Sequence, residues 1–176
     1  FIAGSVAAKE PFLLYLPLTS PHTPLAVTEE WKGKSKLNLY ADFVMQTDAT
    51  VGAVLDALDK QGIAENTMII FTSDNGCSRE ADYPELLAKG HNPSYHFRGW
   101  KSDIFEGGHR VPFLVRWPDR VKPGASSSQL TCLSDLFATC AEILDANLPR
   151  DGAEDSLSFL PSALGKASDA ARTTLV

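Results

Sequence analysis

The chain has 176 residues, of which 44% are hydrophobic and 22% charged, a composition typical of a globular protein with a sizeable core. Its net charge of −6 argues against a nucleic-acid partner, and no apolar run is long enough to span a bilayer as a helix. Its three cysteines are an odd number with no close pair, which argues against a disulfide framework, and none lies in a Cys-x-x-Cys motif, which argues against zinc or thiol redox chemistry.

The first third of the chain predicts a strand, a loop and a helix. The apolar run 11–17, bounded by prolines, predicts a buried strand, and the loop 19–24 that follows places His22 between two prolines. Apolar side chains recur at helical spacing over residues 39–61. Asp48 lies near the apolar line of this helix, where a buried carboxylate needs a partner. We assign Asp48 a structural or supporting role; the alternative is an edge position that reaches solvent.

A second apolar run, residues 67–73, predicts another buried strand that ends directly at Asp74 and Asn75. A carboxylate beside a carboxamide supplies the hard oxygen ligands that Ca²⁺ or Mg²⁺ prefers. In open α/β sheets, ligands bind at this end of the strands. Taken alone, Asp-Asn-Gly is also common turn chemistry. The order strand, helix, strand predicts a parallel right-handed crossover.

Residues 77–100 predict a long loop without regular structure, a kind of segment that is often functional. It contains three candidate substrate-facing residues with open roles, and Cys77 at its start is given no role. Lys101 follows this loop and precedes Glu106-Gly107-Gly108, where glycines permit a tight turn. We expect Arg110 to hold this turn by hydrogen bonds to carbonyls or to a carboxylate, a structural role. The candidates with open roles are His91, His96 and Trp100.

The rest of the chain predicts three further elements. Residues 112–117 predict a strand that proline enters at its first position. Residues 134–144 predict a helix with Ser134 as its N-cap. Residues 156–164 predict a short helix or turn, and residues 172–176 the start of a strand.

Four polar residues follow the predicted strands and the long loop, and they form one candidate site. If the strands at 11–17 and 67–73 are parallel neighbours, His22 and Asp74 emerge at the same sheet edge. A cation bound by Asp74 and Asn75, with the imidazole of His22 and the ammonium of Lys101, would suit an anionic ester. The metal would polarise the ester, while histidine and lysine bind its oxygens or protonate the leaving group.

These segments, in this order, resemble the sulfatases, the arylsulfatase-like members of the alkaline phosphatase superfamily. The resemblance covers nearly the whole chain, and its motifs are weak singly but specific together. It implies an α/β fold, a three-layer α/β/α sandwich with a mostly parallel sheet. Residues 1–176 are then expected to be a partial catalytic domain, with 172–176 starting a C-terminal subdomain. The segments that carry the resemblance are Pro11-Phe-Leu-Leu-Tyr-Leu-Pro17, Ser20-Pro-His-Thr-Pro24, 40–52, Phe71-Thr-Ser-Asp-Asn-Gly76, Arg98-Gly-Trp-Lys101, Glu106-Gly-Gly-His-Arg-Val-Pro112 and 151–165.

The resemblance also implies roles for single residues. Asp74 and Asn75 match two ligands of the family's single divalent cation, usually Ca²⁺, with Mg²⁺ as the alternative. Lys101 matches the lysine that contacts the sulfate and the bridging oxygen, and His22 matches a histidine near the leaving group, a candidate proton donor. The implied substrates are sulfate monoesters of small molecules or sugars. The implied nucleophile is a formylglycine hydrate, made from Cys or Ser in a Cys/Ser-x-Pro/Ala-x-Arg motif.

No such nucleophile motif occurs in this chain, and the family's amino-terminal metal ligands are not matched either. We therefore expect these features upstream of residue 1, and we expect the isolated chain not to release a chromogenic phenol from its sulfate. Two alternatives stay open: a phosphate or phosphonate monoester hydrolase of the same superfamily, and a non-catalytic, truncated anion-binding module. The family implies an exported or lysosomal protein; the sequence leaves compartment, oligomeric state and substrate open.

Overall fold

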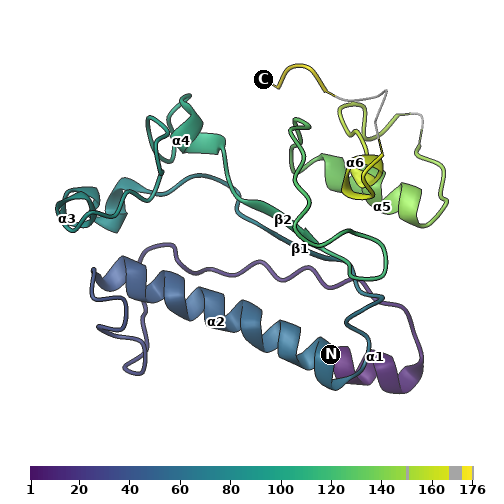
Figure 1. Ribbon diagram of the computed structural model, residues 1–176, viewed down its shortest axis with the longest axis horizontal. Coiled ribbons are helices and arrows are strands. Elements are labelled where there is room, and N and C mark those ends of the chain that lie inside the picture. Colours follow the sequence, from purple (N-terminus) through teal and green to yellow (C-terminus); the bar gives the residue numbers. More distant parts are fainter. Residues whose placement is uncertain (150, 167–171, 176) are drawn as a thin grey trace. The chain divides into compact units, whose positions relative to one another are not determined.

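The protein is described by a computed structural model that covers residues 1–149, 151–166 and 172–175 (Figure 1). The chain forms two compact units, which are described separately. Unit 1 contains residues 1–64 and 71–113, and unit 2 contains residues 65–70 and 114–176. All four residues of the predicted site belong to unit 1, so that the geometry of the site can be read within one unit.

The long helix predicted from the sequence is confirmed. Helix α2 spans Leu39–Lys60, and its N-cap Asn38 accepts a hydrogen bond from the Ala41 N–H at 3.0 Å. The Asn38 amide also donates to the Ala81 carbonyl at 2.8 Å. This amide therefore caps the helix and ties it to a segment 43 residues further along the chain. Helix α1, Ile2–Ala8, precedes it at the start of unit 1.

The segment 77–100 is not the unstructured loop that the sequence predicted. It contains a 3₁₀ helix η1, Arg79–Ala81, and a helix α3, Tyr83–Ala88. Both are too short to show a hydrophobic period, and each is started by a side-chain cap: Ser78 accepts from the Glu80 N–H, and Asp82 accepts from the Glu85 N–H. Their apolar side chains pack against the start of α2, in a core formed by Ala41, Ala81 and Leu86 with Leu37, Tyr40 and Cys77 around it.

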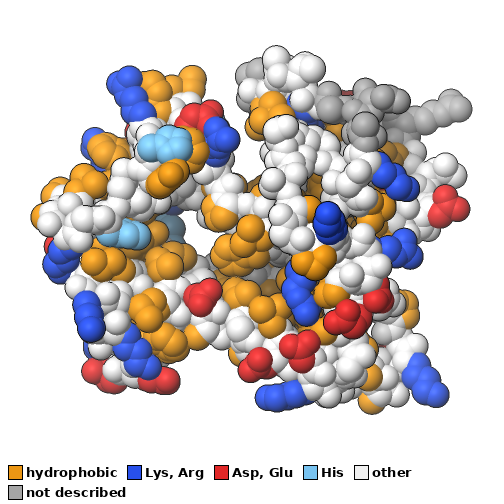
Figure 2. Space-filling model, in the orientation of Figure 1, with side chains coloured by type: hydrophobic (Ala, Val, Ile, Leu, Met, Phe, Trp, Pro, Cys, Tyr) orange, Lys and Arg blue, Asp and Glu red, His pale blue; other side chains and the backbone are white. Residues whose placement is uncertain are grey.

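The strand predicted over residues 11–17 is wrong for this structure. Leu13 and Tyr15 are 81% and 83% exposed, and within the described residues no strand pairs with this segment. A strand exists only where a neighbour completes its hydrogen bonds, and an apolar run does not show whether that neighbour is present. The segment instead runs extended in Figure 1, and Ser20 bonds to Thr47 of α2 at 2.9 Å. Hydrophobic side chains are visible at the surface in Figure 2.

The strands predicted over residues 67–73 and 112–117 are confirmed in place and are shorter than expected. Strand β1 spans Ile69–Thr72 and strand β2 spans Phe113–Arg116, and the two are neighbours in a two-stranded sheet. Since 11–17 forms no strand, the predicted parallel pair with the 67–73 segment is not formed. The three-layer sandwich stays a prediction, because two strands do not make its central layer.

Helix α4, Glu106–His109, belongs to unit 1. Unit 2 contains helix α5, Asp135–Ile143, and helix α6, Leu160–Ala163. The predicted cap Ser134 holds the N-cap position of α5 but makes no side-chain cap bond. The Ser156 hydroxyl accepts from the Ala138 N–H at 2.9 Å instead. Leu130 and Arg172 form an antiparallel bridge, while residue 176 of the predicted final strand lies outside the described residues.

Candidate active site

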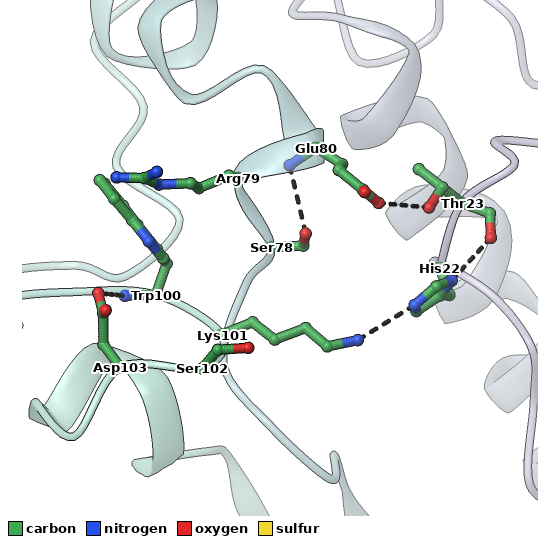
Figure 3. Close-up of a pocket in the computed structure, with 9 residues that line it drawn as sticks. All are labelled: His22, Thr23, Ser78, Arg79, Glu80, Trp100, Lys101, Ser102 and Asp103. Carbon is green, nitrogen blue, oxygen red and sulfur yellow. Dashed lines mark hydrogen bonds between the residues drawn. The ribbon is translucent and has the colours of Figure 1, made fainter.

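The candidate site is a hollow in unit 1 with a volume of about 530 Å³ (Figure 3). Pockets of this size are typical of small-molecule sites. Three short segments form its wall: the proline-rich loop, the start of η1, and the segment that ends the long connection. The lining residues are His22, Thr23, Ser78, Arg79, Glu80, Trp100, Lys101, Ser102 and Asp103.

His22 and Lys101 meet in this hollow. The Lys101 Nζ lies 3.1 Å from His22 Nε2, although 79 positions separate the two residues. The other ring nitrogen, Nδ1, lies 2.7 Å from the Thr23 carbonyl oxygen. A carbonyl only accepts, so we assign the imidazole proton to Nδ1, and the Nε2 lone pair then accepts from the lysine. The structure thus brings together the two residues that the sequence predicted for catalysis.

Backbone hydrogen bonds place Lys101 beside the end of β1. The Lys101 N–H donates to the Cys77 carbonyl at 2.9 Å, and the Gly76 N–H donates to the Gly108 carbonyl at 2.9 Å. Asp74 and Asn75 directly precede this anchored stretch. The predicted metal ligands thus lie between the end of β1 and this anchored stretch, which a glycine of α4 holds, and neither ligand is among the residues that line the hollow.

Glycine is required at these anchors because backbones touch there. A Cβ on Gly76 would lie 1.8 Å from the Gly107 carbonyl oxygen, and one on Gly107 would lie 2.1 Å from that of Gly99. A Cβ on Gly108 would meet the Asp103 carbonyl oxygen at 2.2 Å. Each of these contacts is with backbone, so a side chain could enter only if the segments moved apart.

We expect Gly108→Ala to lower the free energy of unfolding by about 1–3 kcal/mol and to separate Lys101 from His22, because the clash is with backbone. Chemical denaturation and the His22 ring NMR signals would measure the two effects. Gly52→Ala, within α2, is the control, because nothing lies within 4 Å of its added Cβ and its φ is not positive. An unchanged His22 signal in Gly108→Ala would contradict the expectation.

Asp74 and Asn75 offer oxygen atoms of the kind that a hard cation binds. The Asp74 carboxylate is exposed. The Asn75 amide nitrogen donates to the Gly76 carbonyl at 3.0 Å, which leaves its Oδ1 as an acceptor. Two such ligands are fewer than the six to eight oxygens of a Ca²⁺ site. No group of three or more His, Cys, Asp or Glu residues that could hold a metal occurs in the described part of the chain. The chain thus fits part of a metal site.

The remaining predicted residues have distinct surroundings. Arg110 donates to the Glu106 carboxylate at 2.7 Å and lies over the Phe97 ring, which is the kind of structural contact expected of it. Asp48 is exposed and its side chain forms no hydrogen bond within the described residues, as in the solvent-facing alternative. Cys77 is half-buried, and burial raises the pKa of its thiol, so the neutral form is favoured and a nucleophilic role is not.

The three residues whose roles the sequence left open differ in their surroundings. Trp100 lines the hollow, whereas His91 and His96 are exposed and do not line it. His96 lies between the rings of Tyr95 and Phe97, with centroid distances of 4.3 and 4.4 Å.

Sequence reasoning missed Arg79 and Glu80. The Arg79 guanidinium lies 4.1 Å from the Trp100 ring centroid, and Glu80 accepts a hydrogen bond from the Thr23 hydroxyl. Their position five and six residues after Asp74 was the only signal, and it does not distinguish them from surface charge.

Comparison with known proteins identifies the family. The family model described as Sulfatase matches residues 2–146. An N-acetylgalactosamine-6-O-sulfatase of Bacteroides thetaiotaomicron is 38% identical over 161 residues, which cover 90% of this chain and 31% of that protein. A steryl-sulfatase of Rattus norvegicus is 39% identical, covering 88% of this chain and 27% of that protein.

A solved structure agrees with these sequence matches. It belongs to work on the metabolism of multiple glycosaminoglycans by Bacteroides thetaiotaomicron, is 37% identical, and has a TM-score of 0.84. The match covers 93% of this chain and 35% of that one. The chain therefore spans about a third of the length of these relatives. On the match over residues 2–146, this chain belongs to the sulfatase family of sulfuric ester hydrolases.

Proposed function

We propose that this chain contributes the leaving-group side of a catalytic site that hydrolyses sulfate monoesters. The 3.1 Å contact between Lys101 Nζ and His22 Nε2 carries the proposal. Among the residues that the structure describes, neither side chain forms an ion pair, so both can turn to an incoming anion. The family supports sulfate as that anion.

The two side chains suit the two needs of the leaving group. Cleavage breaks the S–O bond, and its electron pair passes to the bridging oxygen, which becomes more basic. The Lys101 ammonium stabilises this negative charge, and an imidazole that has taken up a proton from solvent at Nε2 can pass that proton to the oxygen and return to its neutral form. The Thr23 carbonyl keeps the imidazole oriented with Nε2 toward the hollow.

The proposed site needs two components in addition to these side chains: a divalent cation and a nucleophile. Asp74 and Asn75 would hold a divalent cation, Ca²⁺ or alternatively Mg²⁺, which when bound supplies positive charge to the sulfate oxygens. The nucleophile, a formylglycine hydrate, would come from the family's motif, which this chain does not contain. We propose for the parent protein the three-layer α/β/α sandwich with a mostly parallel sheet.

We propose a sulfated sugar as the substrate class. Support comes from the name of the N-acetylgalactosamine-6-O-sulfatase and from the glycosaminoglycan context of the solved relative. The family also supports an exported or lysosomal location. Within the described ranges, no helix is both long and apolar enough to cross a membrane.

The test uses the protein expressed from its complete reading frame. We expect it to release sulfate from N-acetylgalactosamine 6-sulfate, to lose this activity after chelation, and to regain it with Ca²⁺ rather than Mg²⁺. The matched phosphate ester is the control substrate. Faster turnover of the phosphate ester would favour the phosphatase alternative, and turnover of neither ester would favour a non-catalytic anion-binding module.

A further inference from the structure

The hollow contains a second cationic group in addition to Lys101. The Arg79 guanidinium carbon lies 4.1 Å from the centroid of the Trp100 ring, and both residues line the hollow together with His22. Figure 3 shows the Arg79 side chain lying along Trp100, away from the contact between Lys101 and His22. Arg79 forms no ion pair with any residue that the structure describes.

The acidic groups of the hollow are engaged elsewhere. Glu80 accepts a hydrogen bond from the Thr23 hydroxyl, and Asp103 accepts one from the Trp100 backbone N–H at 3.1 Å. Each carboxylate thus bonds an uncharged donor. The Arg79 guanidinium is left without a carboxylate, although two line the same hollow.

Arg79 is held in position by stacking, and its guanidinium donates no hydrogen bond to any residue in the described part of the chain. It stacks on Trp100, whose ring in turn contacts Tyr83 at a centroid distance of 5.5 Å. Its backbone belongs to η1, which ends at the buried Ala81. Stacking uses the face of the guanidinium and leaves the N–H groups at its edge free. A planar, oriented fork of donors is well suited to a carboxylate or sulfate.

We propose that Arg79 binds a second anionic group of the substrate, while the ester sulfate lies at Lys101 and His22. This inference rests on the proposed function. It narrows the substrate class to sulfated oligosaccharides with another anionic oxygen group near the scissile sulfate. That group is either the carboxylate of a neighbouring uronate or a second sulfate. A steryl sulfate, with a single anionic group, leaves Arg79 unused.

The experiment compares three substrates of the protein expressed from its complete reading frame. They are N-acetylgalactosamine 6-sulfate, the same sugar joined to a uronate, and the same sugar with a second sulfate. We expect Arg79→Gln to lower kcat/KM about 10- to 100-fold for a two-anion substrate, as expected for losing hydrogen bonds to a charged group. The single-anion substrate should stay within about twofold. Which two-anion substrate loses more identifies the anion.

Arg120→Gln is the matched control. Arg120 also stacks on a tryptophan, Trp117, at 5.1 Å, but belongs to unit 2 and does not line the hollow. Arg120→Gln should change kcat/KM for none of the three substrates by more than about twofold. Arg79→Lys, which keeps the charge and loses the planar fork, should fall between wild type and Arg79→Gln.

Equal losses on all three substrates, or no loss on either two-anion substrate, would overturn the proposal. Calorimetric Kd values for the two-anion sugars separate it from the proposed function. Weaker binding to Arg79→Gln, without turnover of any ester by the wild type, would support this second anion site and reject sulfate hydrolysis. Turnover of the esters by the wild type, with no effect of Arg79→Gln on rate or Kd, would support sulfate hydrolysis and reject the second anion site.

Discussion

His22→Ala is expected to lower kcat/KM for an aryl sulfate by about 10²–10⁴-fold, the usual contribution of a general acid. Its Nε2 lies 3.1 Å from Lys101 Nζ and faces the hollow, so its loss removes the proton path to the leaving oxygen. Lys101→Met should cost about 10²–10³-fold, because it removes a positive charge aimed at the developing oxyanion. Steady-state kinetics of the protein expressed from its complete reading frame would measure both.

Two features distinguish this chemistry from a loss of structure. Phenols of lower pKa need less proton transfer, so the loss in His22→Ala should shrink along a series of better leaving groups. The double variant should lose less than the product of the single losses, because the two residues act on one oxygen. Lys60→Met, at the exposed end of α2, is the control. A loss independent of the leaving group would contradict proton donation by His22.

The sequence predicted best the features that depend on local pattern. Helix α2 is long enough for its hydrophobic period to be unambiguous, and β1 and β2 are short apolar runs bounded by turn residues. The convergence of His22 and Lys101 was also predicted, and it occurs although the parallel strand pair expected to bring His22 to Asp74 is not formed. The backbone hydrogen bonds that the Cys77 carbonyl accepts from Lys101 and the Gly108 carbonyl accepts from Gly76 place the lysine instead.

The features that the sequence could not predict depend on distant partners. Residues 11–17 have the pattern of a strand but no paired neighbour among the described residues. Helices η1 and α3 are set by single caps, and the stacking of Arg79 on Trp100 joins residues 21 positions apart. No spacing in the sequence marks such a pair, since an isolated arginine is usually solvated.

Asp135 in unit 2 is another residue whose role depends on distant partners. Its side chain is 1% exposed and receives four hydrogen bonds. Two come from the Arg172 guanidinium at 2.8 and 2.9 Å, and two from the N–H groups of Cys132 and Leu157 at 2.8 and 2.9 Å. One carboxylate thus joins the start of α5 to two later segments of the chain.

Arg172→Met is expected to lower the free energy of unfolding of unit 2 by about 3 kcal/mol, the lower end of the range for breaking a buried ion pair. The lower end applies because the Arg172 side chain keeps 11% exposure. The Asp135 carboxylate would stay buried with two backbone donors. Hydrogen exchange of the amides around residues 132–160 would measure the local opening. Arg116→Met, an exposed arginine of β2 with no ion pair in the described ranges, is the control.

The pH dependence gives an independent check. Burial acts to raise the pKa of Asp135, but the hydrogen bonds from Arg172, Cys132 and Leu157 outweigh it, and the pKa lies below its ordinary value of 3.8. A carboxyl group with a lowered pKa stabilises the folded state fully above about pH 4, and this stabilisation is lost as the pH falls through the folded-state value. Arg172→Met removes the two hydrogen bonds from the guanidinium, so burial has the larger effect and the pKa of Asp135 rises. The stability difference between wild type and variant should therefore shrink as the pH falls below about 4. A difference that stays constant with pH would mean that Arg172 stabilises unit 2 by packing rather than through its charge.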